Sequence, residues 1–161
     1  MDSDYPFPLF RFHVEFKRVR MDSLEEGAEV DLCRGAFSEC SGLEATMEPK
    51  VIKAGGANYG PFQRVGPVTF GTVILKRGIT TNRHLWKWFS HVSERANSAF
   101  RLNVIITVEA PGEGGPEPAL IVRLARAVPI KLKIGDLNGT ASEVGIEELH
   151  LAHEGLSLDT P

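Results

Sequence analysis

Regular alternation of apolar and polar residues is the feature that most restricts what this chain can fold into. From Leu9 to Lys17, phenylalanine and valine side chains alternate with charged ones. The same two-residue period recurs at 44–52, 102–110, 127–133 and 144–151. Successive side chains of an extended strand point to opposite faces of a sheet, so this period predicts strands with one buried face. We therefore expect a protein built mainly of β-sheet.

One change of period interrupts this pattern. Val68–Lys76 is rich in β-branched residues and predicts a central strand. After Gly78 the apolar spacing becomes helical, at Leu85, Phe89, Val92 and Ala96. Side chains suited to N-capping precede this segment at 80–82. Because Trp86 and Trp88 widen the apolar stripe, we expect one helix that buries much of its circumference against the sheet.

Glycine, proline and polar residues mark the connections. Segments 53–67 and 111–118 are rich in glycine and proline and predict projecting loops or hairpin tips. The acidic segment 135–143 predicts a loop, and the polar insert 18–34 predicts a long loop or a hairpin extension.

Three positions predict irregular strands. Gly42 indicates a bend after a short strand at 35–41, because glycine adopts positive φ at low cost. Pro49 lacks a ladder donor and predicts an edge strand or a bulge. The alternation slips by one residue at Glu147 and Glu148, which predicts a bulge there.

These segments indicate one domain over residues 1–161, with 1–8 as an N-terminal extension. About seven strands and one helix, joined by hairpin-like connections, predict two packed antiparallel sheets. We expect a small β-barrel or sandwich capped by the amphipathic helix. A chain of 161 residues can bury a core without staples, so we interpret Cys33 and Cys40 as free thiols.

Composition argues against two classes of partner. The formal net charge of −3 does not favour a protein that holds nucleic acid through a basic surface. The acidic start, Met1–Pro6, does not resemble a signal peptide, and no run reaches the roughly 20 apolar residues that cross a bilayer. We expect synthesis in the cytoplasm and no membrane insertion by this chain.

The sequence contains no clear catalytic or metal-binding arrangement. His84 and His91 share a helix face but lack a third ligand, and His150 and His153 fall on opposite faces of a strand. Acidic pairs, such as Glu147 with Glu148, or Asp136 with Glu143, are more often solvated than catalytic. Neither a phosphate loop nor a nucleophile elbow is present. We therefore expect a protein that is not an enzyme and uses neither a cofactor nor a metal.

Three segments in order resemble the phage tail tube protein family of contractile phage tails and phage-tail-like extracellular contractile injection systems. The first is Phe37–Glu44, and the second is Leu75–Gly78 followed by the Trp86-x-Trp88 helix. The third comprises Ala127-x-Pro129-x-Lys131, Asp136–Asn138, Glu143–Val144, Ile146–Glu147 and His153–Leu156. The resemblance covers roughly Leu9 to Leu158.

This resemblance implies a two-sheet β-barrel with one helix, of which six copies close into a ring. Rings stack into the inner tube that a contracting sheath drives outward, and the lumen conducts cargo, either a toxin protein or phage DNA. The implied partners are further copies of the chain and the sheath, baseplate, spike and tube-cap proteins. The 1–8 extension and the 18–34 insert leave two roles open, the main tube subunit or a specialised ring at the tube's end.

The resemblance also suggests where assembly contacts lie. The glycine-rich segment Ala54–Gly60 and its flanking strands are expected to build the lumen wall and to reach the neighbouring ring. The candidate residues are Lys50, Lys53, Gly55, Gly56, Asn58 and Tyr59. Lys76 and Arg77 are candidates for salt bridges between rings. The helix residues Leu85, Trp86, Trp88 and Phe89 are candidates for core or subunit contact. The alternative is a monomeric β-barrel that binds a small apolar or carbohydrate ligand, with the aromatic helix at its site.

Overall fold

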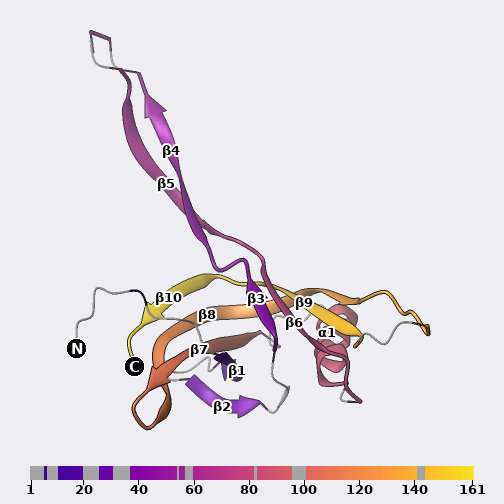
Figure 1. The fold of residues 1–161 in the computed structure, drawn as a ribbon. Helices are drawn as coiled ribbons and strands as arrows, with labels where there is room; N and C mark the ends of the chain where they lie inside the picture. The colour runs from indigo at the N-terminus through magenta and orange to yellow at the C-terminus, as the bar shows by residue number, and fades with distance from the viewer. Residues whose placement is uncertain are drawn as a thin grey trace.

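The computed structural model describes residues 6, 11–19, 26–30, 37–53, 55–56, 60–81, 83–95, 101–140 and 144–161, without the side chains of 26–30 and 95. Within these ranges the chain forms ten strands and one helix (Figure 1). They are β1 Arg11–Val19, β2 Glu26–Val30, β3 Glu39–Ser41, β4 Ala45–Ile52, β5 Phe62–Phe70, β6 Val73–Gly78, α1 His84–Arg95, β7 Leu102–Gly112, β8 Gly115–Ile134, β9 Ile146–Ala152 and β10 Gly155–Asp159. No helix in the described part has the length and apolar character needed to cross a membrane.

Eight of these strands form one antiparallel sheet, the body of the molecule. Its hydrogen-bonded order is β2-β1-β7-β8-β9-β6-β3, and β10 also pairs with β8. The 20-residue strand β8 takes part in two layers: its first half pairs with β7 and β10, and its second half pairs with β9. The sheet bends along β8, so that one layer faces the other. The prediction of packed antiparallel sheets with one helix is confirmed, but the strands of the described ranges do not close into a barrel.

Two bulges bend β8. At the first, Asn103 of β7 faces two residues, Ala125 and Arg126, and Arg126 has a φ of 51°. The Asn103 side chain accepts a hydrogen bond from the Arg126 backbone N–H at 3.1 Å. The second bulge lies between Pro129 and Lys131, opposite β9. Because an extra residue on one strand increases its bend and twist, these positions let a single strand serve both layers.

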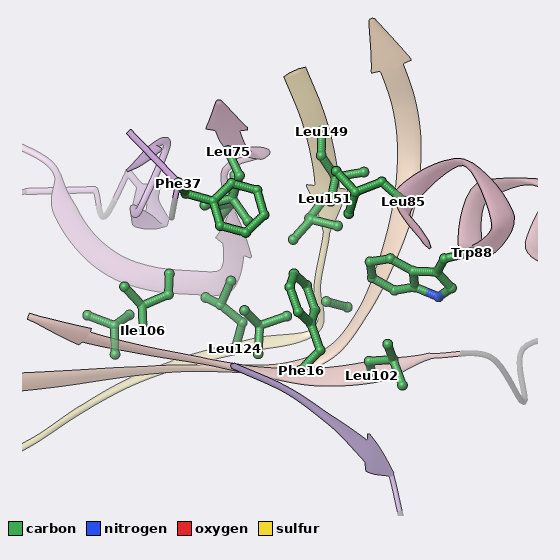
Figure 2. Packing of buried hydrophobic residues seen from close by; sticks show 14 residues of the cluster. Phe16, Phe37, Leu75, Leu85, Trp88, Leu102, Ile106, Leu124, Leu149 and Leu151 are labelled. Atoms are coloured by element: carbon green, nitrogen blue, oxygen red, sulfur yellow. The ribbon is translucent and has the colours of Figure 1, made fainter. Parts of the chain in front are cut away.

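The core lies between the layers and is closed at one end by the helix (Figure 2). Leucine and valine side chains of β6 and β9 pack against those of β1, β7 and β8. Leu85 and Trp88 of α1 are buried, and the Trp88 ring meets Phe16 edge-on at 5.6 Å between centroids. Trp86 is 55% exposed, so the expectation that the helix buries much of its circumference is wrong. One face of α1 contacts the body, and Trp86 lies outside it.

An ion pair lies within this core. Arg77 of β6 and Glu147 of β9 are directly opposite each other, and the Arg77 side chain is 2% exposed. Arg77 Nε donates to the Glu147 carboxylate, and the guanidinium lies 5.9 Å from the centroid of the Phe37 ring. The predicted bulge at Glu147 and Glu148 is wrong, because β9 pairs with β6 in unbroken register. The alternation slips because Glu147 points inward, like Leu149 and Leu151, to neutralise Arg77.

Strands β4 and β5 form a separate two-stranded sheet, called the ribbon below, that projects from the body (Figure 1). At its base Gly42 has a φ of 82°, and a Cβ there would lie 1.9 Å from the Thr72 carbonyl oxygen, which confirms the predicted bend. The predicted central strand Val68–Lys76 is wrong as one element. Residues 68–70 end the ribbon, and β6 begins at Val73 inside the body.

Several other expectations need correction. Residues 62–67 were expected in a loop and instead form most of β5, while Gly55 and Gly56, earlier in the segment, form a turn. The segments 119–124 and 127–133 are parts of the single strand β8. Strand β2 lies in the 18–34 insert and pairs antiparallel with β1, which confirms the hairpin alternative for that insert. Strand β10, which follows the expected last strand, was not predicted.

The buried ion pair generates a stability prediction. Glu147→Ala removes the counter-charge of a buried guanidinium, so we expect it to lower the free energy of unfolding by about 3–5 kcal/mol. Replacing both partners with apolar residues, Arg77→Met with Glu147→Leu, should lower the free energy of unfolding much less. Urea denaturation of dilute protein measures both. If the double replacement costs as much as Glu147→Ala alone, the effect is one of packing and not of an unpaired charge.

Candidate assembly surfaces

The ribbon has one apolar and one polar face. Directly paired residues of an antiparallel ladder share a face, so the register assigns the faces. The apolar face carries Ala45, Met47, Pro49 and Val51 of β4 and Val65, Val68 and Phe70 of β5, with Gln63 opposite Val51. The other face carries Thr46, Glu48, Lys50, Arg64 and Thr69, with Ile52 and Phe62 toward the tip.

The apolar face is largely exposed to water. All eight residues of β4 are exposed, and Met47, Val51 and Val65 are 54%, 55% and 75% exposed. Isolated two-stranded hairpins are marginal in water, and exposed apolar surface of this kind marks an interaction site. The ribbon therefore has the character of a surface that another molecule covers.

A bulge halfway along the ribbon depends on a glycine. Two residues of β5, Gly66 and Pro67, face Glu48 alone, which places the irregularity next to Pro49 as expected. A Cβ on Gly66 would lie 2.4 Å from the Glu48 carbonyl oxygen, so no larger residue fits without a backbone shift. The bulge increases the twist of the ribbon.

The predicted lumen and ring-contact residues fall on this element. Lys50 is on the polar face, Lys53 follows β4, and Gly55 and Gly56 form a turn at the tip. All four are exposed. Asn58 and Tyr59 lie outside the described residues. The structure thus places the described candidates together at the far half of the ribbon.

A second exposed apolar surface, the helix-end patch, lies where α1 meets the ends of β8 and β9. It comprises Ile79, Trp86, Ile134, Leu137, Val144 and Ile146. A groove of about 470 Å³ runs between Trp86, Leu132 and Leu137, with Arg83 and Glu147 among its lining residues. Leu137 is 81% exposed. Sequence periodicity identified Trp86 but not the loop residue Leu137, because a loop has no period to read. Val144 was expected to begin the last strand, but β9 begins at Ile146.

The two residues expected to bridge rings have different environments. Arg77 is enclosed and paired with Glu147 of the same chain, so its side chain is not available to a neighbouring ring. Lys76 points outward, with its Nζ 3.3 Å from Glu39 and 3.9 Å from Glu148. A hydrogen bond from the His150 ring lowers the pKa of Glu148, and nearby Lys133 and Lys76 lower it further. Lys76 therefore belongs to a charge cluster on the outer side of β6 and β9.

Other reactive side chains are held in structural contacts. His153 Nδ1 lies 2.9 Å from the Gly155 carbonyl oxygen, and its ring packs on Phe70 at the base of the ribbon. Burial raises the pKa of the Cys40 thiol to about 11, which keeps it protonated and weakly nucleophilic near neutral pH. Cys33 lies outside the described ranges. Among the described residues, no group of three or more His, Cys, Asp and Glu side chains is placed to hold a metal.

Comparison with protein families decides what kind of protein presents these surfaces. A model of the family described as T4-like virus tail tube protein gp19 matches residues 8–157. The chain belongs to this family. The expected resemblance is confirmed over nearly the whole length of this tail tube protein, and its family is one of structural tube proteins. A comparison with curated proteins gives no match.

Several solved structures have the same fold as this chain. A chain in the anti-feeding prophage (AFP) baseplate is 25% identical, with a TM-score of 0.76 over 98% of both chains. A chain of the PVC extracellular contractile injection system, from its sheath–tube complex in the extended state, is 18% identical with a TM-score of 0.75 over 98% of this chain and 94% of that one. Hcp1 from Flavobacterium johnsoniae is 12% identical, with a TM-score of 0.55 over 94% and 97%. This tail tube protein therefore shares its fold with chains of the AFP baseplate and of the PVC sheath–tube complex, and with Hcp1.

The helix offers a test that separates core from surface. Leu85→Ala leaves a cavity in the buried cluster and should lower the free energy of unfolding by about 2–5 kcal/mol. Trp86→Ala, one residue further, should change it by no more than about 0.5 kcal/mol in unassembled protein, because that side chain is exposed. Urea denaturation of both variants is the measurement. A large loss for Trp86→Ala would contradict its assignment to the surface.

Proposed function

We propose that this tail tube protein, as one tail tube domain, assembles into six-copy rings that stack into the hollow inner tube of a contractile tail or injection system. The observation that carries the proposal is the ribbon, an exposed two-stranded sheet with one apolar face. A heterologous interface that closes makes a ring, and a second interface along the axis makes a filament. A surface that must be covered, on a chain of this family, fits such an axial contact.

In the proposed tube the ribbon builds part of the lumen wall and reaches the neighbouring ring. Its polar face, with Lys50 and Arg64, turns to the water of the lumen or to polar groups of other copies. Its apolar face packs on neighbouring copies. Lys53, Gly55 and Gly56 lie in the part that reaches the next ring, and Asn58 and Tyr59 are proposed to take part in the same contact. Because successive side chains of a strand point to opposite faces, the same two strands present both the polar and the apolar face of the ribbon, which suits a thin wall.

The helix-end patch is the proposed contact between neighbours within a ring. Trp86 is its largest side chain, and aromatic residues at the centre of an interface contribute much of the binding energy. Phe89 stacks on Trp86 with 6.0 Å between ring centroids, which orients the indole toward the surface. Leu85 and Trp88 belong to the core and not to this contact.

The proposed partners are the sheath around the tube, the baseplate and spike below it, and a cap above it. The solved neighbours support this, since they come from an AFP baseplate, a PVC sheath–tube complex and an AFP tube-terminating cap. In this proposal the chain is made in the cytoplasm, is structural and not catalytic, and ends in a particle whose lumen conducts a toxin protein or phage DNA. The rival ligand-binding monomer has less support, because the body is not a closed barrel and Trp88 is packed in the core.

Assembly of purified protein is the direct test of the proposed function. We expect native mass spectrometry to show six-copy rings and negative-stain microscopy to show stacks of rings. Long open-ended tubes indicate the main tube subunit, whereas single rings or short stacks indicate a tube-end ring. A strictly monomeric protein at high concentration, also in the presence of its particle partners, would contradict the proposal.

A substitution of Trp86 tests the proposed contact between neighbours within a ring. Trp86→Ser should shift the population from rings to monomers by at least about tenfold, because truncating an aromatic hot spot costs about 2 kcal/mol or more. Lys87→Ser, at the adjacent exposed position, is the matched control and should leave rings intact. Equal ring formation by Trp86→Ser and wild type would remove Trp86 from the interface.

Hydrogen exchange tests the dependence of the ribbon on assembly. Amides of β4 and β5 should exchange rapidly in unassembled protein, because each strand has only one neighbour and no core beneath it. The same amides should become protected in tubes, while those of β7 and β8 are protected in both states. Strong protection of the ribbon in the unassembled chain would show that it needs no partner.

A further inference from the structure

Two cations face each other on the polar side of the ribbon. Lys50 and Arg64 are directly opposite in the β4–β5 ladder, and both are exposed. Like charges directly across a ladder destabilise it. The one acid on this face, Glu48, is opposite Gly66 and Pro67, and neither Lys50 nor Arg64 belongs to an ion pair with another described residue. The pairing is mildly unfavourable in the isolated chain, and an anionic neighbour would relieve it.

The turn between β7 and β8 carries the opposite charge. Residues 109–118 contain Glu109, Glu113 and Glu117 and no cation. Glu109 is already occupied, because Arg11 donates to its carboxylate and His13 lies 3.3 Å from it. Glu113 and Glu117 are exposed near the end of the hairpin, and Glu117 folds back over Gly112. No described ion pair includes either of them, so this acidic tip lacks a counter-charge among the residues that the structure describes.

The two surfaces point in opposite directions from the body. In Figure 1 the ribbon rises from one side of the body, and the β7–β8 turn hangs from the other, on the same lateral half of the molecule. Lys50 lies five residues beyond the start of β4 at Ala45, or about 17 Å along the ribbon at 3.3–3.4 Å per residue. A copy stacked above in the same orientation would turn its β7–β8 turn toward the ribbon of the copy below.

We propose that the ribbon cations Lys50 and Arg64 of one copy bind the acidic β7–β8 tip, Glu113 and Glu117, of a copy in the next ring. This rests on the proposed stacking of rings and names the receiving surface. The charge pair gives the stack its polarity, because ribbon meets tip favourably whereas ribbon against ribbon or tip against tip places like charges together. Packing of the ribbon's apolar face against the next copy buries apolar surface, and the charges select the register between the two copies.

Charge reversal tests the pairing. The ribbon variant, Lys50→Glu with Arg64→Glu, has an acidic ribbon and an acidic tip. The tip variant, Glu113→Lys with Glu117→Lys, has both surfaces basic. Each variant alone should form rings by native mass spectrometry but stacks at least about tenfold shorter than wild type by negative-stain microscopy. Mixing preformed rings of the two variants should restore long tubes, because each ribbon then meets a tip of opposite charge.

A control with the same charge change as the ribbon variant shows whether the position of the charges matters for stacking. Lys87→Glu with Lys131→Glu alters exposed lysines of α1 and the second half of β8 and should leave tube length unchanged. Tubes of normal length from the tip variant would overturn the pairing, as would mixed rings that remain short. Loss of tubes in the ribbon variant alone would also overturn the pairing and would assign the cations to a different acidic surface of the neighbouring copy. If wild type forms neither rings nor tubes, the proposed function fails and not merely this contact.

Discussion

The bend of β8 is the constraint on which the rest of the structure depends. A flat sheet of eight strands would expose one apolar face, and a small chain has few other elements to cover it. The bulges at Arg126 and beside Ile130 let one strand continue from the first layer into the second. The sheet then covers its own apolar face, and α1 closes one end of the core with Leu85 and Trp88.

Because the body covers its own core, the apolar surfaces that stay exposed indicate where other molecules bind. The ribbon emerges where β3 ends and β6 begins, so it starts at an edge of the folded sheet and contributes nothing to the core. Its apolar face and the helix-end patch are each larger than isolated exposed side chains would explain. A tube subunit needs contacts of two kinds, one around the ring and one along the axis, and the body leaves two such surfaces at different ends. The proposed assembly uses both without altering the core.

Charge is used differently inside and outside the body. Arg77 and Glu147 neutralise each other between the layers, where an unpaired ion would be costly, and they pin the register of β6 against β9. Lys50, Arg64, Glu113 and Glu117 lie outside, where water screens them in the free chain. Their value would come only when another copy excludes that water. The first pair serves folding, and the proposed second set serves the order of assembly.

Prediction from the sequence succeeded where side-chain period and local chemistry decide the outcome. The strand at 11–17, the helix after Gly78, the bend at Gly42 and the irregularity at Pro49 follow from rules that act within a few residues. It failed where a distant residue intervened. Val68–Lys76 has one continuous apolar period, yet Phe70 ends the ribbon and Val73 enters the core, because Gly71 and Thr72 lie where the chain passes from one to the other. Arg77 was expected at a ring contact because its buried partner, Glu147, is 70 residues away.

The sequence by itself determined the class of fold, the number of helices expected, the glycine-rich projecting segment and the tail tube family, since these are properties of local pattern and of motifs in order. Only the tertiary structure decided which apolar residues are core and which are surface. Met47 and Val65 have the same character as Leu75 and Leu149, and alternation cannot separate them. The difference is whether a second layer lies above the strand, and that depends on a bend in β8 made by residues far along the chain.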